Sequence, residues 1–256
     1  MALRLSKGLR NYLLEGGSLK NALAGGKILL YTGSQPTLAD DAVTGTLLNT
    51  YTVSSGAHTA EVRASGTVTL NTGASGSVDT VTANSVEIMG SATAFNTSLT
   101  QTAADVATKI NNNPKNLMYV ATSSGAVITV TARYGLGTLG NVTLASTVTT
   151  ITKTDVNMTG GVNQVNGLTF GDAAAGVLVK NPAETWSGVA GNTGTAGWFR
   201  FVGSIADAGS ADSSEVYHRL DGNVATSGAN LNLSSTSITA TATQTLSTFS
   251  ITEPAA

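Results

Sequence analysis

Short apolar or alternating segments, separated by Gly, Asn, Asp and Pro, dominate two stretches of the chain, residues 27–58 and 164–256. This spacing is typical of short β-strands joined by turns. The strand candidates are residues 28–31, 46–53, 168–170, 176–179, 198–202, 216–220, 238–243 and 246–251. Asp221-Gly222 predicts a turn directly after 216–220. We expect a β-sandwich or jelly-roll-like domain.

The stretch between them, residues 59–163, predicts the order β-β-α-β-β-β. Ala103, Val106, Ala107 and Ile110 form the apolar stripe of one helix, with Thr102 as its expected N-cap and the run 111–114 (NNNP) as its end. The strands in 27–53 have no obvious partners except the C-terminal ones. We therefore expect a small α+β domain inserted into a discontinuous domain made of 27–58 plus 164–256.

Residues 1–26 are expected to form a basic N-terminal arm with short helices. Leu5, Leu9, Tyr12 and Leu13 share one helical face that ends at the glycines 16–17, and Ser18 is placed to cap a second turn. This arm either packs on its own domain or docks on a neighbouring subunit, and the sequence leaves both interpretations open. The candidate interaction residues are Arg4, Leu5, Lys7, Leu9, Arg10, Leu13 and Lys20.

The most informative feature of the composition is the low content of charged residues. Only 11% of the residues are charged, against about 25% in an ordinary soluble domain, and the net charge is −2. Ser, Thr, Asn and Gly take the place of charge, so the surface should be neutral and rich in hydroxyl groups. Such a surface has no attraction for nucleic acid or anionic membranes, and neither is expected as a partner.

Features that bear on location are few. The chain contains no cysteine and no apolar run of about 20 residues. Its first residues lack the continuous apolar block of a secretory signal. We expect synthesis in the cytoplasm without a signal peptide, so that any release would use another route, such as cell lysis.

The residues that carry chemistry in enzymes are sparse, so no enzymatic activity and no cofactor or metal is expected. His58 and His218 are the only histidines, and neither has an acidic neighbour in sequence. Residues 135–140 match Gly-x-Gly-x-x-Gly, but a β-branched run follows where a nucleotide site needs a helix. This match predicts a turn.

Three further candidates favour structural interpretations. Residues 155–160 imitate the start of a calcium loop, but position twelve is Asn166 instead of glutamate, so an ordinary loop is expected. Asp207, Asp212 and Glu215 are expected in a solvated loop. Trp186 and Trp198 are expected in the core, with a sugar-stacking platform as the alternative.

Several segments resemble structural proteins of tailed bacteriophages and prophages. They are 29–40 (LLYTGSQPTLAD), 44–48 (TGTLL), 167–171 (GLTFG), 184–188 (ETWSG), 195–201 (TAGWFRF) and 219–222 (RLDG). Within the insert, 86–91 (VEIMGS), 101–105 (QTAAD) and 158–162 (MTGGV) are similar to a small module of phage tail and neck proteins.

The resemblance implies a non-enzymatic virion protein that assembles on the capsid surface or at the head-to-tail neck or collar. The N-terminal arm and exposed sheet edges would make the contacts. Its partners would be other copies of the chain and other virion proteins of the capsid, portal, neck or tail. The alternative is a tail or baseplate module that binds a receptor or glycan.

Overall fold

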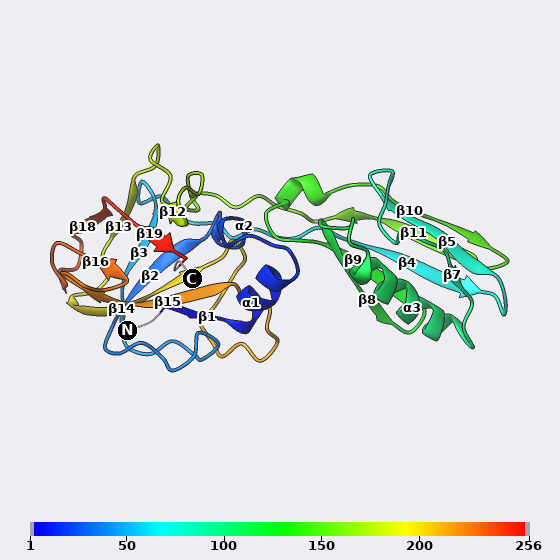
Figure 1. Cartoon of the computed structure of the whole chain (residues 1–256), viewed down its shortest axis with the longest axis horizontal. Coiled ribbons are helices and arrows are strands. Elements are labelled where there is room, and N and C mark those ends of the chain that lie inside the picture. Colours follow the sequence, from blue (N-terminus) through cyan, green and yellow to red (C-terminus); the bar gives the residue numbers. More distant parts are fainter. Residues whose placement is uncertain (1–2, 254–256) are drawn as a thin grey trace. The chain divides into compact units, whose positions relative to one another are not determined.

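The computed structural model describes residues 3–253 and is mostly β, with 42% strand and 12% helix. This confirms the expected mostly-β, sandwich-like fold class. The chain forms two compact units: unit 1 contains the residues up to Glu61 and from Gln164 onward, and unit 2 is Val62–Asn163 (Figure 1). The sequence placed the first of these two boundaries three residues earlier, at 58/59.

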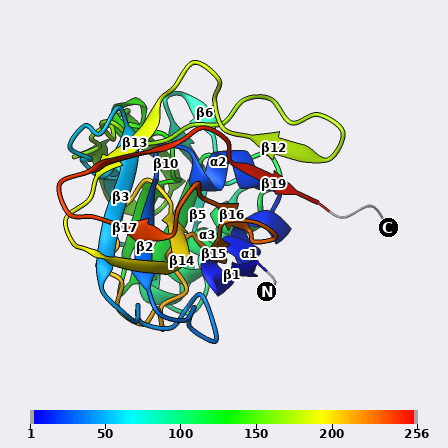
Figure 2. The ribbon, with the colours of Figure 1, turned by 90° about the vertical axis from the view of Figure 1, so that its left-hand side faces the viewer.

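Unit 1 is built on a nine-stranded sheet, and Figure 2 shows β2, β3 and β14 with the two N-terminal helices to one side. All its pairs are antiparallel except β15 with β16. The order is β1 (Arg4–Leu5), β15 (Arg219–Ala225), β14 (Gly194–Val202), β2 (Lys27–Thr32), β3 (Leu47–Val53), β13 (Trp186–Val189) and β18 (Thr243–Leu246). Outside this path, β16 (Leu231–Asn232) pairs with β15, and β17 (Ser237–Ile238) pairs with β14. β12 (Val177–Val179) and β19 (Ser250–Thr252) form a separate two-stranded sheet.

The central strands of this sheet are buried on both faces. Phe199 and Phe201 of β14 enter the main core, which also holds Trp186 and residues of the β12–β19 ribbon. The alternate residues Trp198 and Val202 belong to a smaller cluster on the opposite face. Successive side chains of a strand alternate between its two faces. A strand that is buried on both faces therefore has a nearly continuous apolar sequence, here WFRFV.

The turn predicted at Asp221-Gly222 is wrong, because both residues lie inside β15. The strand also begins at Arg219 and not at Val216. A Cβ at Gly222 would come within 2.5 Å of the Phe199 ring. Glycine is therefore needed for close strand packing and not for a turn.

The arm forms two short helices, α1 (Lys7–Leu14) and α2 (Leu19–Leu23), which confirms the expected helical arm. Ser18 caps α2 as predicted, and its hydroxyl accepts from the Asn21 N–H at 3.1 Å. Leu5 was wrongly expected in the first helix. Ser6 caps α1, so Leu5 precedes the helix and pairs with Leu220 in β1.

Unit 2 encloses its core between two sheets and one helix. One sheet has the order β11 (Thr152–Thr159), β4 (Ser65–Thr72), β9 (Val127–Ala132) and β8 (Tyr119–Ser124). The other has β10 (Leu144–Thr149), β5 (Ser77–Ala83) and β6 (Val86–Glu87), with β7 (Thr93–Ala94) also on β5. The helix α3 (Leu99–Asn112) packs on β8 and β9 and contributes Ala103, Val106, Ala107 and Ile110 to the core.

Two details of unit 2 correct the predictions. The N-cap of α3 is Ser98 and not Thr102, because the Ser98 hydroxyl accepts from the Gln101 N–H at 3.1 Å. The loop expected at residues 155–160 is mostly strand β11, in which Asp155 pairs with Val68 of β4. The glycine-rich motif ends in a short 3-10 helix, η1 (Gly137–Gly140), and not in a nucleotide-binding helix.

The outer edge of β8 is closed by two asparagine side chains. The Asn111 amide donates to the Ala121 carbonyl and accepts from its N–H, both at 2.8 Å. The buried Asn116 amide does the same for Tyr119, at 3.0 and 3.1 Å, and also donates to the Ile110 carbonyl. Each amide imitates one residue of a neighbouring strand, so β8 is blocked at these positions against pairing with another chain.

None of the helices within residues 3–253 has the length and apolar character needed to cross a membrane.

Replacing Asn116 by alanine tests the closed edge. The variant leaves the backbone groups of Tyr119 and Ile110 without partners, so unit 2 should lose about 2–3 kcal/mol of unfolding free energy. Urea denaturation followed by circular dichroism measures this loss. Asn112→Ala, at an exposed residue of the same helix, is the matched control and should unfold like the wild type. Equal midpoints for the two variants would contradict the structural role of Asn116.

Candidate functional site

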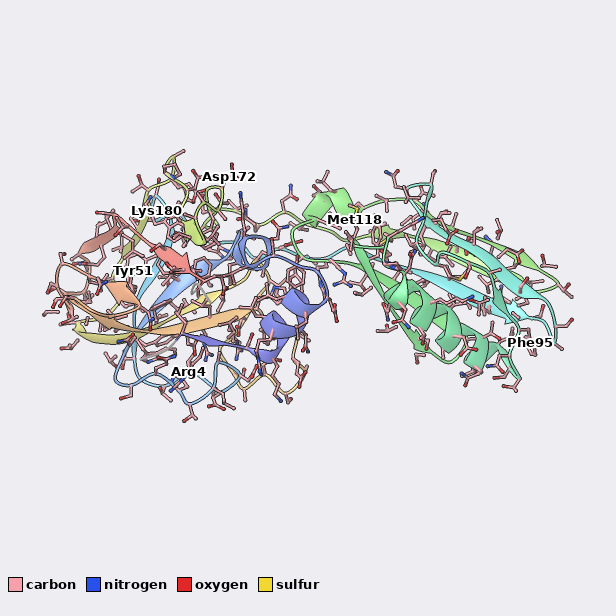
Figure 3. All side chains as sticks on the ribbon, in the orientation of Figure 1. Arg4, Tyr51, Phe95, Met118, Asp172 and Lys180 are labelled. Atoms are coloured by element: carbon pink, nitrogen blue, oxygen red, sulfur yellow. The ribbon has the colours of Figure 1, made fainter. Side chains whose placement is uncertain are left out.

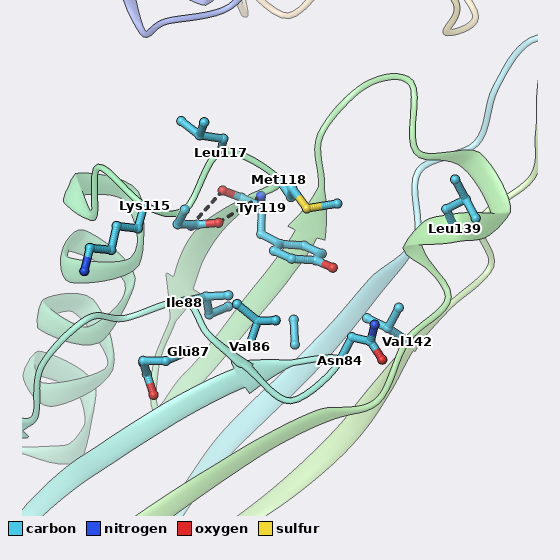
Figure 4. Close-up of a pocket in the computed structure, with 12 residues that line it drawn as sticks. Asn84, Val86, Glu87, Ile88, Lys115, Leu117, Met118, Tyr119, Leu139 and Val142 are labelled. Carbon is cyan, nitrogen blue, oxygen red and sulfur yellow. Dashed lines mark hydrogen bonds between the residues drawn. The ribbon is translucent and has the colours of Figure 1, made fainter.

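The insert carries an apolar groove on its surface (Figure 4). Three segments form its walls: the β5–β6 turn, the loop that leads from α3 into β8, and the stretch from η1 towards β10. The lining residues are Ala83, Asn84, Val86, Glu87, Ile88, Lys115, Asn116, Leu117, Met118, Tyr119, Leu139 and Val142. The hollow has a volume of about 130 Å³.

Large apolar side chains of the groove face the solvent. Leu139 is 75% exposed, Leu117 67% and Val86 64%, and Met118 (labelled in Figure 3) is also exposed. Single exposed leucines are common on proteins, but several around one hollow form the kind of patch that marks a binding surface. The groove is therefore suited to burying apolar side chains of a partner.

Some polar groups of the groove hold its backbone, whereas Glu87 Oε2 is buried without a hydrogen-bond partner among the described residues and Lys115 is exposed. Asn116 holds the backbone of Tyr119, as the dashed lines in Figure 4 show. Glu87 Oε1 accepts from the N–H groups of Met89 and Gly90 at 2.7 and 3.1 Å. Burial raises the pKa of the Tyr119 phenol, which keeps it protonated. This arrangement holds a loop in shape and does not form an acid–base pair.

The arm residues predicted as an interaction surface are mostly engaged within unit 1. Leu9 is fully buried in its core, and Leu5 and Leu13 pack against that core. Arg4 donates to the Pro36 carbonyl. Of the two interpretations left open above, the arm is therefore packed on its own unit. Leu9 is not available to a neighbour in this conformation.

Fewer arm residues are exposed than packed, and the exposed ones are both charged and apolar. Lys7 Nζ lies 3.2 Å from Glu215, and Lys20 Nζ lies 2.8 Å from Asp172. Arg10 is exposed on α1, and Leu14 at the end of that helix is 87% exposed. In an α-helix, residues 7, 10 and 14 lie on one face, so this face presents two cations and one leucine.

Two buried ion pairs on β14 and β15 went unrecognised in the sequence. Arg200 donates to both carboxylate oxygens of Asp221 at 2.8 Å, and Arg219 donates to both oxygens of Asp207 at 2.6 Å. Both arginine side chains are fully buried. Asp207 was expected to be solvated, and that expectation is wrong. The only available signal was an arginine within each apolar strand, at positions 200 and 219.

The environment shifts the pKa values of these groups. Burial raises the pKa of the Asp221 carboxyl, and the hydrogen bonds and charge of Arg200 offset only part of that shift. Burial disfavours the charged form of Arg219, but the hydrogen bonds and charge of Asp207 outweigh this and raise its pKa. Each guanidinium group therefore binds its aspartate through two parallel hydrogen bonds.

The remaining N–H groups of these arginines bind the backbone of two loops. These loops cover the face of the sheet that carries Trp198 and Val202. Arg200 donates to the Asp41 carbonyl at 3.1 Å, and Arg219 donates to the carbonyls of Ala39 and Ser210. Asp212, also expected in solvent, is buried and accepts from the Tyr217 N–H at 2.9 Å. The network is therefore a structural clamp on residues 33–46 and 203–218.

The other candidate residues are buried or bound to the backbone of unit 1. Trp186 and Trp198 are fully buried, so no sugar-stacking platform is available from either indole. His218 lies just before β15, buried, with Nδ1 3.2 Å from the Ala22 carbonyl. His58 Nε2 lies 3.0 Å from the Gly25 carbonyl, and burial lowers the pKa of its ring. Within residues 3–253, no three His, Asp or Glu side chains are grouped to hold a metal ion.

No protein-family model matches the sequence, and no curated protein is similar to it at a significant level.

Replacing Asp207 by alanine tests the clamp. The change leaves the Arg219 guanidinium buried without its carboxylate, which should lower the unfolding free energy of unit 1 by about 3–5 kcal/mol. Chemical denaturation monitored by tryptophan fluorescence follows this unit, because Trp186 and Trp198 both belong to it. The control is Asp172→Ala, which removes an exposed carboxylate paired with Lys20 and should leave the midpoint unchanged. A midpoint for Asp207→Ala equal to the control would contradict the role of the pair.

Proposed function

We propose that the chain is a non-enzymatic structural component of a tailed-phage particle. It assembles on the capsid surface or at the head-to-tail neck or collar, with other copies of itself and other virion proteins as partners. Its site of action is then the virion, after synthesis in the host cytoplasm.

The observation that carries this proposal is the exposed apolar groove of unit 2. A surface that leaves Val86, Leu117 and Leu139 in water gains free energy when a partner covers it, at about 25 cal/mol per Å² of apolar area. Asn116 and Glu87 Oε1 hold the backbone around the groove, which offers shape and apolar area with the exposed Lys115 at its margin. This combination suits a lasting contact between proteins better than turnover of a substrate.

The surface chemistry and the motifs support the same proposal. The segments 29–40, 44–48 and 195–201 resemble phage structural proteins. A neutral, hydroxyl-rich surface has little attraction for the DNA that a phage particle carries. Many identical weak contacts on a symmetric particle add up, so each contact can remain small. The exposed face of α1, with Lys7, Arg10 and Leu14, is a second surface for such contacts.

The test is incorporation into particles. In a phage deleted for its own copy of the gene, the chain is supplied in trans as wild type or as Leu117→Ser/Leu139→Ser. Loss of two anchoring side chains at about 1.4 kcal/mol each predicts about a hundredfold weaker binding. Quantitative mass spectrometry of purified particles should find wild type at full copy number and the groove variant strongly depleted.

The matched control is Val156→Ser, which changes an exposed apolar residue of β11 outside the groove. It should be incorporated like wild type, and all variants should melt at the same temperature. Normal incorporation of the groove variant would remove the groove from the proposal. Absence of the wild-type chain from particles would overturn the proposal itself.

A further inference from the structure

The last three strands of the sheet in unit 1 contain no charged residue. Residues 42–60, 185–199 and 222–252 contain no Asp, Glu, Lys or Arg. These segments include all of β3, β13 and β18, which are the last three strands in the sheet order (Figure 1). Serine and threonine dominate the exposed positions of the terminal strand and of the segments on either side of it.

The terminal strand, β18, presents unpaired backbone groups. The Ala190 N–H donates to the Ala242 carbonyl, and the register places Gly188 opposite Gln244 and Trp186 opposite Leu246. Because hydrogen-bonded and non-hydrogen-bonded pairs alternate, Gln244 and Leu246 bond to β13, whereas the backbone groups of Thr243 and Thr245 point away from it. Within residues 3–253, neither threonine has a hydrogen bond on that outward side.

Two other strand edges, those of β8 and β10, are closed by side chains. Asn111 and Asn116 cover β8, as described above. On β10, the Asp155 carboxylate accepts from the Ser146 N–H and hydroxyl at 2.7 and 2.8 Å, and Asn157 accepts from the Leu144 N–H. Natural sheets blunt their edges by such devices, or by Lys, Pro or bulges, to prevent pairing. Within the described part of the chain, β18 has no covering side chain, Lys, Pro or bulge, and its one protection is its short length of four residues.

We infer that β18 is an interface between two copies of this chain, which pair antiparallel through this edge about a two-fold axis at Gln244. Thr243 of one copy then lies opposite Thr245 of the other, and each such pair exchanges two backbone hydrogen bonds, about four in total. The same edge meets itself, so a charged strand would place like charges together. The absence of charge on β3, β13 and β18 removes that repulsion, and this is why the partner is a second copy.

This inference deepens the proposed function and rests on it, since it names one contact between copies of an assembly protein. The experiment uses the whole purified chain, in sedimentation equilibrium over a wide range of concentration. Wild type should be monomeric when dilute and dimeric when concentrated. Thr245→Pro removes only an outward-facing N–H, and Thr243→Lys/Thr245→Lys brings four cations together in the paired edges.

Both β18 variants should remain monomeric at concentrations where wild type dimerises, with unchanged melting temperatures. The control is Thr122→Lys, at an exposed residue of β8 in unit 2, which should dimerise like wild type. A wild type that stays monomeric up to its solubility limit would overturn the inference, and so would dimerisation of the lysine variant. Neither result bears on incorporation into particles, so failure here is distinguishable from failure of the proposed function.

Discussion

The structure depends on how a nearly uncharged β protein satisfies the backbone groups at its sheet edges. Every open sheet has terminal strands, and their outward N–H and C=O groups are free to pair with a strand of another chain. Charged side chains are the usual deterrent, but only 11% of this chain is charged. In unit 2 the deterrent is an amide or carboxylate that bonds the edge itself, as Asn116 does on β8 and Asp155 does on β10. The few polar side chains directed at backbone therefore decide which edges remain open.

The two buried ion pairs of unit 1 involve β14 and β15, away from the strands β3, β13 and β18, which contain no charged residue. Arg200 and Arg219 are fully buried beneath the loops that cover one face of the sheet. Each donates hydrogen bonds to one aspartate and to loop carbonyl groups. A buried ion pair adds little net stability over an apolar pair, but removing one partner is costly. The clamp therefore fixes the conformation of the two loops at residues 33–46 and 203–218. The opposite end of the sheet keeps the neutral edge.

Patterns of apolar residues predicted the fold well, because burial is periodic. The stripe of α3 and strands such as β2, β3 and β12 followed from spacing, and the insertion followed from the lack of other partners for 27–53. The strands predicted at 238–243 and 246–251 are instead the three short strands β17, β18 and β19, and 168–170 is not a strand. Local signals failed where tertiary contacts decided the outcome: Asp221-Gly222 is strand because Asp221 meets Arg200 and Gly222 meets the Phe199 ring. The groove could not be predicted, since Leu117 and Leu139 read as ordinary strand or turn leucines. Only the folded chain brings them to one hollow.

The central claim is that closed and open edges coexist in one chain, and that the open edge serves assembly. Amide hydrogen exchange, resolved by residue, tests this most directly. In dilute protein, the amides of Tyr119 and Ala121 should exchange slowly, because asparagine side chains hold them, and those of Thr243 and Thr245 should exchange rapidly. In concentrated protein, the two threonine amides should become protected as well. Rapid exchange at Tyr119 and Ala121, or slow exchange at Thr243 and Thr245 in dilute protein, would contradict the account.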